Sequence, residues 1–342
     1  MRPISESDLV TFVERAVSAR AGLIDIRHES AFRLFNGFYE GCPDLAIDVY
    51  ATTLLVHNYA ANVELGAAAA RVAAARAREM LPWLTAVLIK TRNSSVQAER
   101  NGVLLDGGLI ATRIREGGTR YALDLTLNRD ASLYLDTRNL RAWAQAELKG
   151  MSVLNTFAYT GSLGVAALAG GAARVVQLDL NGYFLNVAKT SYTLNGFPIR
   201  KADFIADDFF PALTRLNRTG EQYDCVFLDP PFFSVTPKGV VDLEKSFTRL
   251  INKARPLVRD GGRLIVINNA LFTSGAEVMH DIEALAADGY LAVEALIPVP
   301  EDFTGYAGTR VAGPPVDPAP FNHPTKITIL RVRKKAKQND NP

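Results

Sequence analysis

The 342-residue chain has few cysteines, no long hydrophobic run and almost no net charge. Its two cysteines, Cys42 and Cys225, fit a reducing compartment, and alone they are too few for a disulfide framework or a zinc site. The absence of a run of about 18 apolar residues excludes a transmembrane helix. The first residues include acids and lack an apolar stretch, so we expect no signal peptide and a cytoplasmic protein.

The charge and the composition describe an ordinary globular protein. Hydrophobic residues make up 48% and charged residues 22% of the chain, and its length predicts two domains at roughly 150 residues each. A net charge of +2 neither indicates nor excludes binding to nucleic acid. The one dense basic run, Arg331–Lys337, is either a solvated chain end or a phosphate contact, and composition does not decide between them.

The first part of the chain predicts a small α/β module. A helix is expected over residues 5–20, with Ser5 or Ser7 as its cap, and a hairpin is expected across Gly117-Gly118. Short alternating segments at 31–37, 45–51, 53–60 and 84–92 predict strands, and an Ala/Arg-rich segment at 66–81 predicts a helix. We therefore predict an N-terminal helix in residues 1–20 and an accessory α/β domain in residues 21–118.

The second part predicts a larger, more regular domain over residues 119–335, followed by a basic and polar tail, 336–342. Apolar strands are expected at 152–158, 174–179, 202–206, 223–229, 263–268, 291–299 and 325–332, with helices between the first six. Such alternation is typical of a Rossmann-like, doubly wound, mostly parallel sheet. The last two strands lack an intervening helix and predict an antiparallel edge hairpin. Ligands of such sheets bind beyond the carboxyl ends of the strands.

The residues at the first three strand ends suggest an adenosine cofactor. Gly161 and Gly164 follow the first strand, although a tight turn or close packing explains them nearly as well. Asp179 ends the second strand, where it binds ribose hydroxyls or caps a helix; Asp207 or Asp208 binds adenine or caps the next helix. Because the glycine-rich phosphate cradle is incomplete, the acids favour S-adenosylmethionine over a dinucleotide.

The fourth strand ends in "DPPFF", Asp229–Phe233, which matches the signature of class I methyltransferases that modify planar nitrogen bases. Pro230 and Pro231 fix φ, so the neighbouring carbonyls and the Asp229 carboxylate can accept hydrogen bonds from a base edge. Phe232 or Phe233 can stack on the base. The alternative is that the prolines merely end a strand and the phenylalanines belong to the core.

Five segments resemble the large-subunit ribosomal RNA methyltransferases, a family with guanine-N7 and cytosine-C5 members. They are "SLYLDTR" (132–138), "LNTFAYTGSLGVAAL", "VVQLDLN", "DPPFFS" and "LIVINNALF", and the similarity covers roughly residues 21–335. The resemblance implies a seven-stranded catalytic sheet with a smaller N-terminal α/β domain, S-adenosylmethionine as cofactor and ribosomal RNA as partner. It assigns cofactor contacts to Tyr134, Asp136, Arg138, Asn155, Phe157, Tyr159, Gly161, Asp179, Asp208 and Asp229, and catalysis to Asp229, Pro230, Pro231, Phe232 and Phe233. Without it, Asp136 and Arg138 are a surface ion pair.

The chain departs from the cytosine-C5 branch of that family. No RNA-binding PUA domain precedes the accessory domain, and Asn268 and Asn269 stand where that branch has its nucleophilic cysteine. Cys225 is expected in the core, and Cys42 in a turn. The asparagines resemble the guanine-N7 branch, and Asn268 or Asn269 is expected to orient the base.

The sequence therefore predicts a methyltransferase that acts on a base nitrogen of RNA, most specifically guanine N7 of large-subunit ribosomal RNA, without a metal. Phosphate contacts are expected from Lys238, the basic tail and Arg113, Arg115 and Arg120. Three alternatives stay open: a methyltransferase of a small molecule or free heterocycle, a cytosine-C5 enzyme, and an RNA-binding assembly protein with a vestigial pocket. The Pro/Gly-rich segment 298–324 is either a lid over the substrate or a surface connection.

Overall fold

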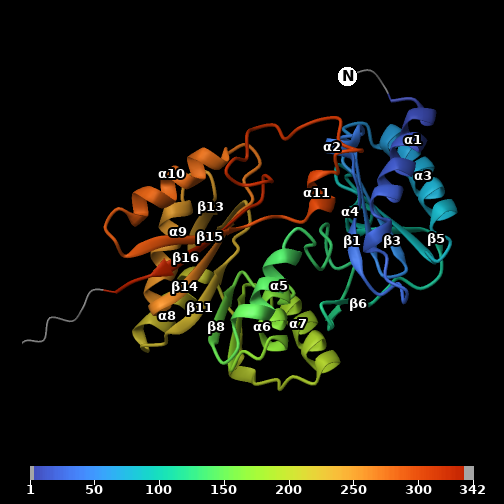
Figure 1. Ribbon diagram of the computed structural model, residues 1–342. Coiled ribbons are helices and arrows are strands. Elements are labelled where there is room, and N and C mark those ends of the chain that lie inside the picture. The colour runs from blue at the N-terminus through green and yellow to red at the C-terminus, as the bar shows by residue number, and fades with distance from the viewer. Residues whose placement is uncertain (1–3, 335–342) are drawn as a thin grey trace, which may run out of the picture. The chain divides into compact units, whose positions relative to one another are not determined.

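The computed structural model describes residues 4–334, which form two compact units (Figure 1). The first unit contains the chain up to Arg138 and, in addition, Pro300–Pro314. The second unit contains Asn139–Val299 and the described residues from Pro315 on. The predicted tail, 336–342, and the end of the basic run lie outside the described residues. Within 4–334, no helix has the length and apolar character needed to cross a membrane.

The first unit is built on a five-stranded sheet in the order β1-β2-β3-β4-β5. Its strands are β1 (Ala31–Asn36), β2 (Leu45–Tyr50), β3 (Thr53–Asn58), β4 (Ala86–Thr91) and β5 (Val103–Gly107). Only β3 and β4 pair in parallel, across the crossover helix α3 (Val63–Met80). Smaller elements are η1 (Ala21–Leu23), α2 (Gly37–Glu40), α4 (Gln97–Asn101) and the hairpin β6 (Arg113–Glu116)–β7 (Thr119–Ala122), which confirms the turn at Gly117-Gly118.

The N-terminal helix α1 (Glu6–Ala19) is part of this unit rather than a separate segment. Ser5 caps it by accepting a bond from the Asp8 amide (3.1 Å). Its apolar face, including Leu9 and Val13, is buried with α3 against one face of the sheet. An amphipathic helix must cover its apolar stripe, which explains why the unit begins before the predicted boundary at residue 21.

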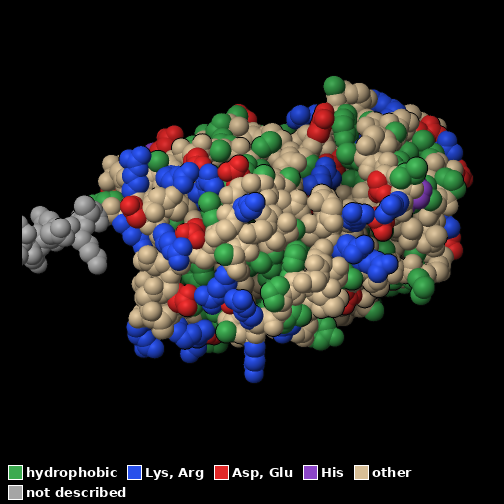
Figure 2. Space-filling view, turned by 60° about the horizontal axis from the view of Figure 1, so that its bottom comes forward, with side chains coloured by type: hydrophobic (Ala, Val, Ile, Leu, Met, Phe, Trp, Pro, Cys, Tyr) green, Lys and Arg blue, Asp and Glu red, His purple; other side chains and the backbone are tan. Residues whose placement is uncertain are grey.

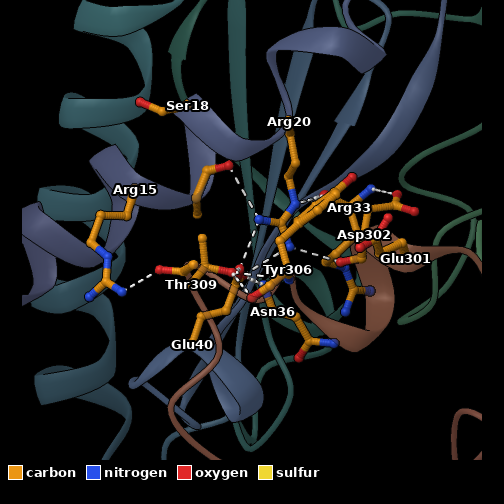
Figure 3. A network of polar contacts seen from close by, with 12 residues as sticks. Arg15, Ser18, Arg20, Arg33, Asn36, Glu40, Glu301, Asp302, Tyr306 and Thr309 are labelled. Carbon is orange, nitrogen blue, oxygen red and sulfur yellow. Dashed lines mark hydrogen bonds and ion pairs between the residues drawn. The ribbon is translucent and has the colours of Figure 1, made fainter.

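The middle of the 298–324 segment is also built into the first unit (Figure 3). The short helix α11 (Glu301–Thr304) places the Asp302 carbonyl 2.9 Å from Arg20 Nη2. Arg20 also donates two bonds to the Glu40 carboxylate (2.8 and 3.0 Å), and Thr309 Oγ1 donates a third bond to it (2.5 Å). All four of these residues are buried. The polar network anchors this stretch to the first unit through a few buried residues, although most of its side chains are exposed or half-buried. Composition alone does not reveal this contact, because the partners are far apart in sequence.

The second unit is a seven-stranded sheet in the order β10-β9-β8-β11-β14-β16-β15, which confirms the predicted Rossmann-like fold class. Its strands are β8 (Ser152–Thr156), β9 (Arg174–Asp179), β10 (Phe204–Ala206), β11 (Tyr223–Leu228), β14 (Val258–Asn268), β15 (Leu291–Ile297) and β16 (Lys326–Val332). The last two pair antiparallel as predicted. However, β16 lies between β14 and β15, so of these last two strands β15 is an edge strand and β16 is not.

Helices cover both faces of this sheet, which explains the continuous apolar strands. One face packs against α8 (Phe209–Arg218), α9 (Phe247–Ala254) and α10 (Gly275–Ala286); α6 (Ser162–Ala169) and α7 (Gly182–Asn195) cover the other. In β11, Val226 and Leu228 join the first of these cores. The remaining elements are α5 (Arg138–Glu147), the 3-10 turns η2 (Lys201–Asp203) and η3 (Arg255–Leu257), and a hairpin of β12 (Phe233–Thr236) and β13 (Gly239–Asp242).

Candidate active site at the carboxyl edge of the second sheet

Five neighbouring parallel strands end at one edge of the sheet of the second unit: β10, β9, β8, β11 and β14. The predicted site residues that lie along this edge are Asn155, Phe157, Tyr159, Gly161, Asp179, Asp208, Asp229, Pro230, Pro231, Phe232, Phe233 and Asn268. Tyr134, Asp136 and Arg138 belong to the first unit. The topology therefore brings most of the predicted residues together because parallel strands deliver their loops to the same edge.

The turn after β8 has an unusual backbone. Phe157 and Tyr159 have φ values of 53° and 50°, in the left-handed region that disfavours residues other than glycine, and Gly161 follows with φ 77°. Each non-glycine conformation of this kind costs of order 1–3 kcal/mol and persists only when its surroundings enforce it. Here the Tyr159 amide donates to Asp179 Oδ2 (2.7 Å), and the Phe157 ring stacks on Phe209 at 4.6 Å.

Asp179 organises this turn and does not cap the following helix. Its two oxygens accept bonds from the amides of Tyr159 (2.7 Å) and Asn181 (2.8 Å). The cap of α7 is Asn181, which accepts from the Tyr183 amide (2.9 Å), so the helix-cap alternative for Asp179 is wrong. Burial raises the pKa of Asp179, and the two amide bonds oppose that shift. Each oxygen keeps a further lone pair, which leaves acceptor capacity for ribose hydroxyls.

The two glycines of the turn are required by close packing. A Cβ at Gly161 would lie 2.6 Å from the Ala188 Cβ, and one at Gly164 would lie 2.2 Å from Gln177 Nε2. Gln177 Nε2 donates to the Gly161 carbonyl (3.1 Å), and Asn155 Nδ2 donates to Gln177 Oε1 (2.8 Å). Close packing therefore explains why both positions are glycine, and Gly161 is in addition part of the turn after β8.

Asn155 is the residue of this group with an unused polar atom. Its side chain is buried, and its Oδ1 has no hydrogen-bond partner among the described residues. A buried carbonyl oxygen without a donor is costly, and such groups in native proteins commonly await a ligand or water. Together with the free lone pairs of Asp179, this acceptor fits a cofactor rich in hydrogen-bond donors, such as the amino and hydroxyl groups of S-adenosylmethionine.

Asp208 caps α8, the alternative that the sequence left open. Its Oδ1 accepts from the Phe210 amide (2.9 Å), and its Oδ2 accepts from Thr236 Oγ1 (2.5 Å). Its neighbour Asp207 pairs with Arg215 on the surface (2.6 Å). A contact from Asp208 to adenine stays a prediction, and it would add to two existing bonds.

The Asp229–Phe233 motif begins directly after the last residue of β11. Pro230 is buried, whereas Phe232 and Phe233 are 44% and 58% exposed. The alternative that both phenylalanines belong to the core is therefore wrong. Two large aromatic side chains remain accessible at the strand end, and their contact with a base stays a prediction.

The end of β14 and the turn after it contain one buried and one exposed asparagine. Asn268 is buried, and its Oδ1 accepts from the Ala270 amide (2.9 Å), which gives it a role in shaping the turn; Asn269 is exposed. Lys326, which the sequence analysis did not select, is also buried and donates to the carbonyls of Ala270 and Pro324 (both 2.8 Å). Burial lowers the pKa of Lys326 to about 8. Its only sequence signal is a lysine at the start of an apolar strand.

Both cysteines are buried and unsuited to nucleophilic attack. Cys225 is fully buried in β11, as predicted, and burial raises the pKa of its thiol far above the usual range. Burial also raises the pKa of Cys42 to about 11. Because the thiolate is the reactive form, neither side chain has the electropositive, accessible environment of a catalytic cysteine.

Arg138, predicted to contact the cofactor, is paired within the first unit. Its Nη2 lies 2.5 Å from Asp302 Oδ1, and the Asp302 carboxylate also accepts from the Arg33 amide (2.9 Å). Asp302 is buried, so Arg138 takes part in an interior ion pair rather than a purely surface one. A cofactor contact from Tyr134, Asp136 or Arg138 stays a prediction.

Comparison with known families identifies the chain. A family model described as S-adenosylmethionine-dependent methyltransferase matches residues 83–309, more than half of the sequence. The chain belongs to this family. The match spans the turn after β8, the Asp229–Phe233 motif and the turn after β14, so the edge described above lies within the residues that the family model matches.

Curated relatives of this family member include two kinds of ribosomal RNA methyltransferase. Ribosomal RNA large subunit methyltransferase K/L from Shewanella loihica is 30% identical over 72% of this chain and 34% of its own length. Ribosomal RNA large subunit methyltransferase I from Aeromonas hydrophila is 30% identical over 75% of this chain and 66% of its own length. The predicted resemblance is thereby confirmed. The chain spans about a third of the first relative and about two thirds of the second.

Solved structures agree with the fold. The crystal structure of SMU.776 complexed with SAH matches with a TM-score of 0.82 at 21% identity, covering 97% of this chain and 83% of that one. The SAM-dependent methyltransferase from Agrobacterium tumefaciens matches with a TM-score of 0.59 at 17% identity, covering 85% and 87%. At these identities the similarity concerns the architecture alone.

Proposed function

We propose that this protein transfers a methyl group from S-adenosylmethionine to N7 of a guanine in large-subunit ribosomal RNA. The observation that carries the proposal is the pair of exposed aromatic side chains, Phe232 and Phe233, which follow Asp229 and two prolines. They lie at the same edge of the sheet as the turn after β8 and Asp179. The names of the relatives, both ribosomal RNA large subunit methyltransferases, support RNA as the substrate.

Cofactor binding would fall to Asp179 and to the turn after β8. The Asp179 carboxylate would accept bonds from the ribose hydroxyls, and Asn155 Oδ1 would accept a bond from the amino-acid portion. When bound, the cofactor supplies an electrophilic methyl group on a positive sulfonium. The carboxylate at this edge also provides the negative charge that a cation favours.

The base would be held by the strand end of β11. Asp229 and the carbonyls fixed by Pro230 would accept from the guanine edge, an exposed phenylalanine would stack on its face, and Asn269 would help orient it. Guanine N7 has a lone pair and no proton. When the new C–N bond forms and the C–S bond breaks, the positive charge moves to the base, and no general base is needed. Placement and exclusion of water then do most of the catalytic work.

Nitrogen chemistry is favoured over cytosine-C5 chemistry by the state of the cysteines. Attack on C6 of a pyrimidine requires an accessible thiolate, and the raised pKa and burial of Cys42 and Cys225 oppose one. Lys and Arg side chains are spread over the face in Figure 2, with Asp and Glu among them. This distribution suits several separate phosphate contacts, for which affinity falls steeply with salt.

Two measurements test the proposal. The purified protein, S-adenosylmethionine and large-subunit ribosomal RNA from cells that lack the gene should yield 7-methylguanosine in nucleoside mass spectrometry. Appearance of 5-methylcytidine, or of no methylated nucleoside, would contradict it. In calorimetry, Asp179→Asn should weaken S-adenosylmethionine binding tenfold or more, since a charge-assisted bond contributes roughly 1.5–3 kcal/mol. The matched control, Asp281→Asn, changes an exposed acid on α10, away from these strand ends, and should bind normally.

A further inference from the structure

The β12–β13 hairpin that follows the Asp229–Phe233 motif has one apolar, outward face. In its antiparallel register Val235 pairs with Val240, and Phe233 lies two residues before Val235 on the same side. These three side chains are 58% (Phe233), 63% (Val235) and 41% (Val240) exposed. By the same register Asp242, the partner of Phe233, lies on this side as well. The outward face of the hairpin, defined here as Phe233, Val235 and Val240, therefore offers water three apolar side chains with one acid at its edge.

The opposite face holds the hairpin firmly on the domain. Thr236 Oγ1 donates to Asp208 Oδ2 (2.5 Å), and Val241 is buried in the core. Gly239 packs so closely on Phe210 that a Cβ there would lie 2.3 Å from the ring. The exposure of the outward face is thus a property of an anchored element and does not come from a loose loop. An isolated two-stranded hairpin is only marginally stable, so these anchors are what maintain it.

The surroundings of the outward face favour nucleic acid. Lys238 lies in the turn at the tip, Lys245 follows β13, and Arg249 lies 5.2 Å over the Phe210 ring that contacts Gly239. These three basic side chains stand against two acids, Asp242 and Glu244. Apolar and aromatic side chains flanked by basic ones are the usual surface for an unpaired base and its phosphate.

The size of the face argues against a protein partner. Stable protein interfaces take about 20–30 residues from each side, whereas this face presents three side chains on two four-residue strands. A single nucleobase is of the right scale. Because Phe233 belongs to both the motif and the hairpin, the face continues directly from the proposed position of the target base.

We propose that the outward face of the hairpin binds an unpaired nucleobase next to the target nucleotide, while Lys238 contacts a neighbouring phosphate. The proposal rests on the proposed function, because it requires an RNA substrate. It also divides the two phenylalanines: Phe233 joins the flanking-base surface, and Phe232 is left to stack on the target. Binding energy gained away from the reacting atom would then select RNA over a free base.

The test compares Val235→Ser/Val240→Ser with a matched control, Val293→Ser, which alters a 38% exposed valine on β15. The double variant should raise the KM for large-subunit ribosomal RNA about tenfold, because two serines remove apolar surface that the base would cover. Its kcat and its calorimetric affinity for S-adenosylmethionine should match wild type. Lys238→Gln should reduce the slope of log affinity against log salt by about one.

The outcomes separate this proposal from the proposed function. If wild type methylates no RNA, the proposed function fails. If wild type is active and the double variant has the same KM as Val293→Ser, the function stands and the hairpin surface is wrong. A loss of S-adenosylmethionine affinity in the double variant would overturn the proposal in favour of a cofactor role. If wild type self-associates in sedimentation and the double variant does not, the face binds a second copy of the chain and the proposal is wrong.

Discussion

In the first unit charged side chains lie inside and are paired, whereas at the carboxyl edge of the second sheet aromatic side chains lie outside. Arg20, Glu40 and Asp302 are buried and satisfy one another and nearby backbone groups. At the edge of the second unit, Phe232 and Phe233 are exposed, and two non-glycine residues of the turn after β8 have strained backbones. The donors and acceptors of the interior network are bonded to one another, whereas side chains at the edge of the second sheet remain accessible to ligands.

Both units contain a buried strand lysine that donates hydrogen bonds to loop carbonyls. Lys90 in β4 is buried and donates to the carbonyls of Asn128 (2.6 Å) and Asp130 (2.8 Å). Lys326 in β16 does the same for Ala270 and Pro324. Each amine fixes a loop through its carbonyls. The loop held by Lys326 lies beside the proposed base site, whereas the loop held by Lys90 is part of the first unit.

The largest expected effect comes from breaking the interior network. Arg20→Met leaves the buried Glu40 carboxylate without its counter-ion, which should lower the free energy of unfolding by about 3–5 kcal/mol. Calorimetric unfolding measures this. Arg78→Met is the matched control, because Arg78 pairs with Asp106 on the surface of the same unit, and it should cost no more than about 1 kcal/mol. Equal losses for the two variants would show that burial of the pair does not matter.

The two buried lysines should give stability an unusual pH dependence. Burial lowers the pKa of both Lys90 and Lys326 from 10.5 to about 8. Between about pH 8 and 10.5 the unfolded chain then binds more protons, so the free energy of unfolding should rise with pH by about 3 kcal/mol per lysine. Below pH 8 both lysines are charged in the folded protein, so the full cost of burying their charges lowers the free energy of unfolding.

Lys326→Met and Lys90→Met should each remove one lysine's share of that rise in urea unfolding curves recorded from pH 7.5 to 10.5. Lys245→Met, at an exposed position, should leave the slope unchanged. Only Lys326→Met should also lower the rate of methyl transfer, because it releases the turn at Asn269. If Lys90→Met slows transfer equally at matched fractions of folded protein, the assignment of separate roles is wrong.

The sequence predicted the features that depend on residues close together in the chain, such as strands, strand ends, caps and tight turns. The strands of the second sheet are buried on both faces and therefore read as continuous apolar runs, and their ends located Asp179 and Asp229. The capping of α1 by Ser5 and the hairpin at Gly117-Gly118 were equally local.

Features set by distant contacts escaped prediction. Arg20 meets Asp302 across 282 positions, so no window of sequence reveals that segment 300–314 belongs to the first unit. The β12–β13 hairpin was missed because its four-residue strands are half exposed and the first of them begins two residues after Pro231. Lys326 was missed because a lysine in an apolar strand ordinarily marks a solvated position, and only its partners show that it is buried.

The smallest expected effect is on the cysteines, and it tests the chemistry most directly. Cys225→Ser and Cys42→Ser should retain methyl transfer to guanine within about twofold, since a thiol held protonated by burial cannot supply the nucleophile. Cys225→Ala serves as the folding control, because serine places a hydroxyl in an apolar core and can unfold the protein for that reason alone. If a folded Cys225→Ala protein binds S-adenosylmethionine but transfers no methyl group, a cysteine takes part in the reaction. The asparagines after β14 would then be no guide to the atom that is methylated.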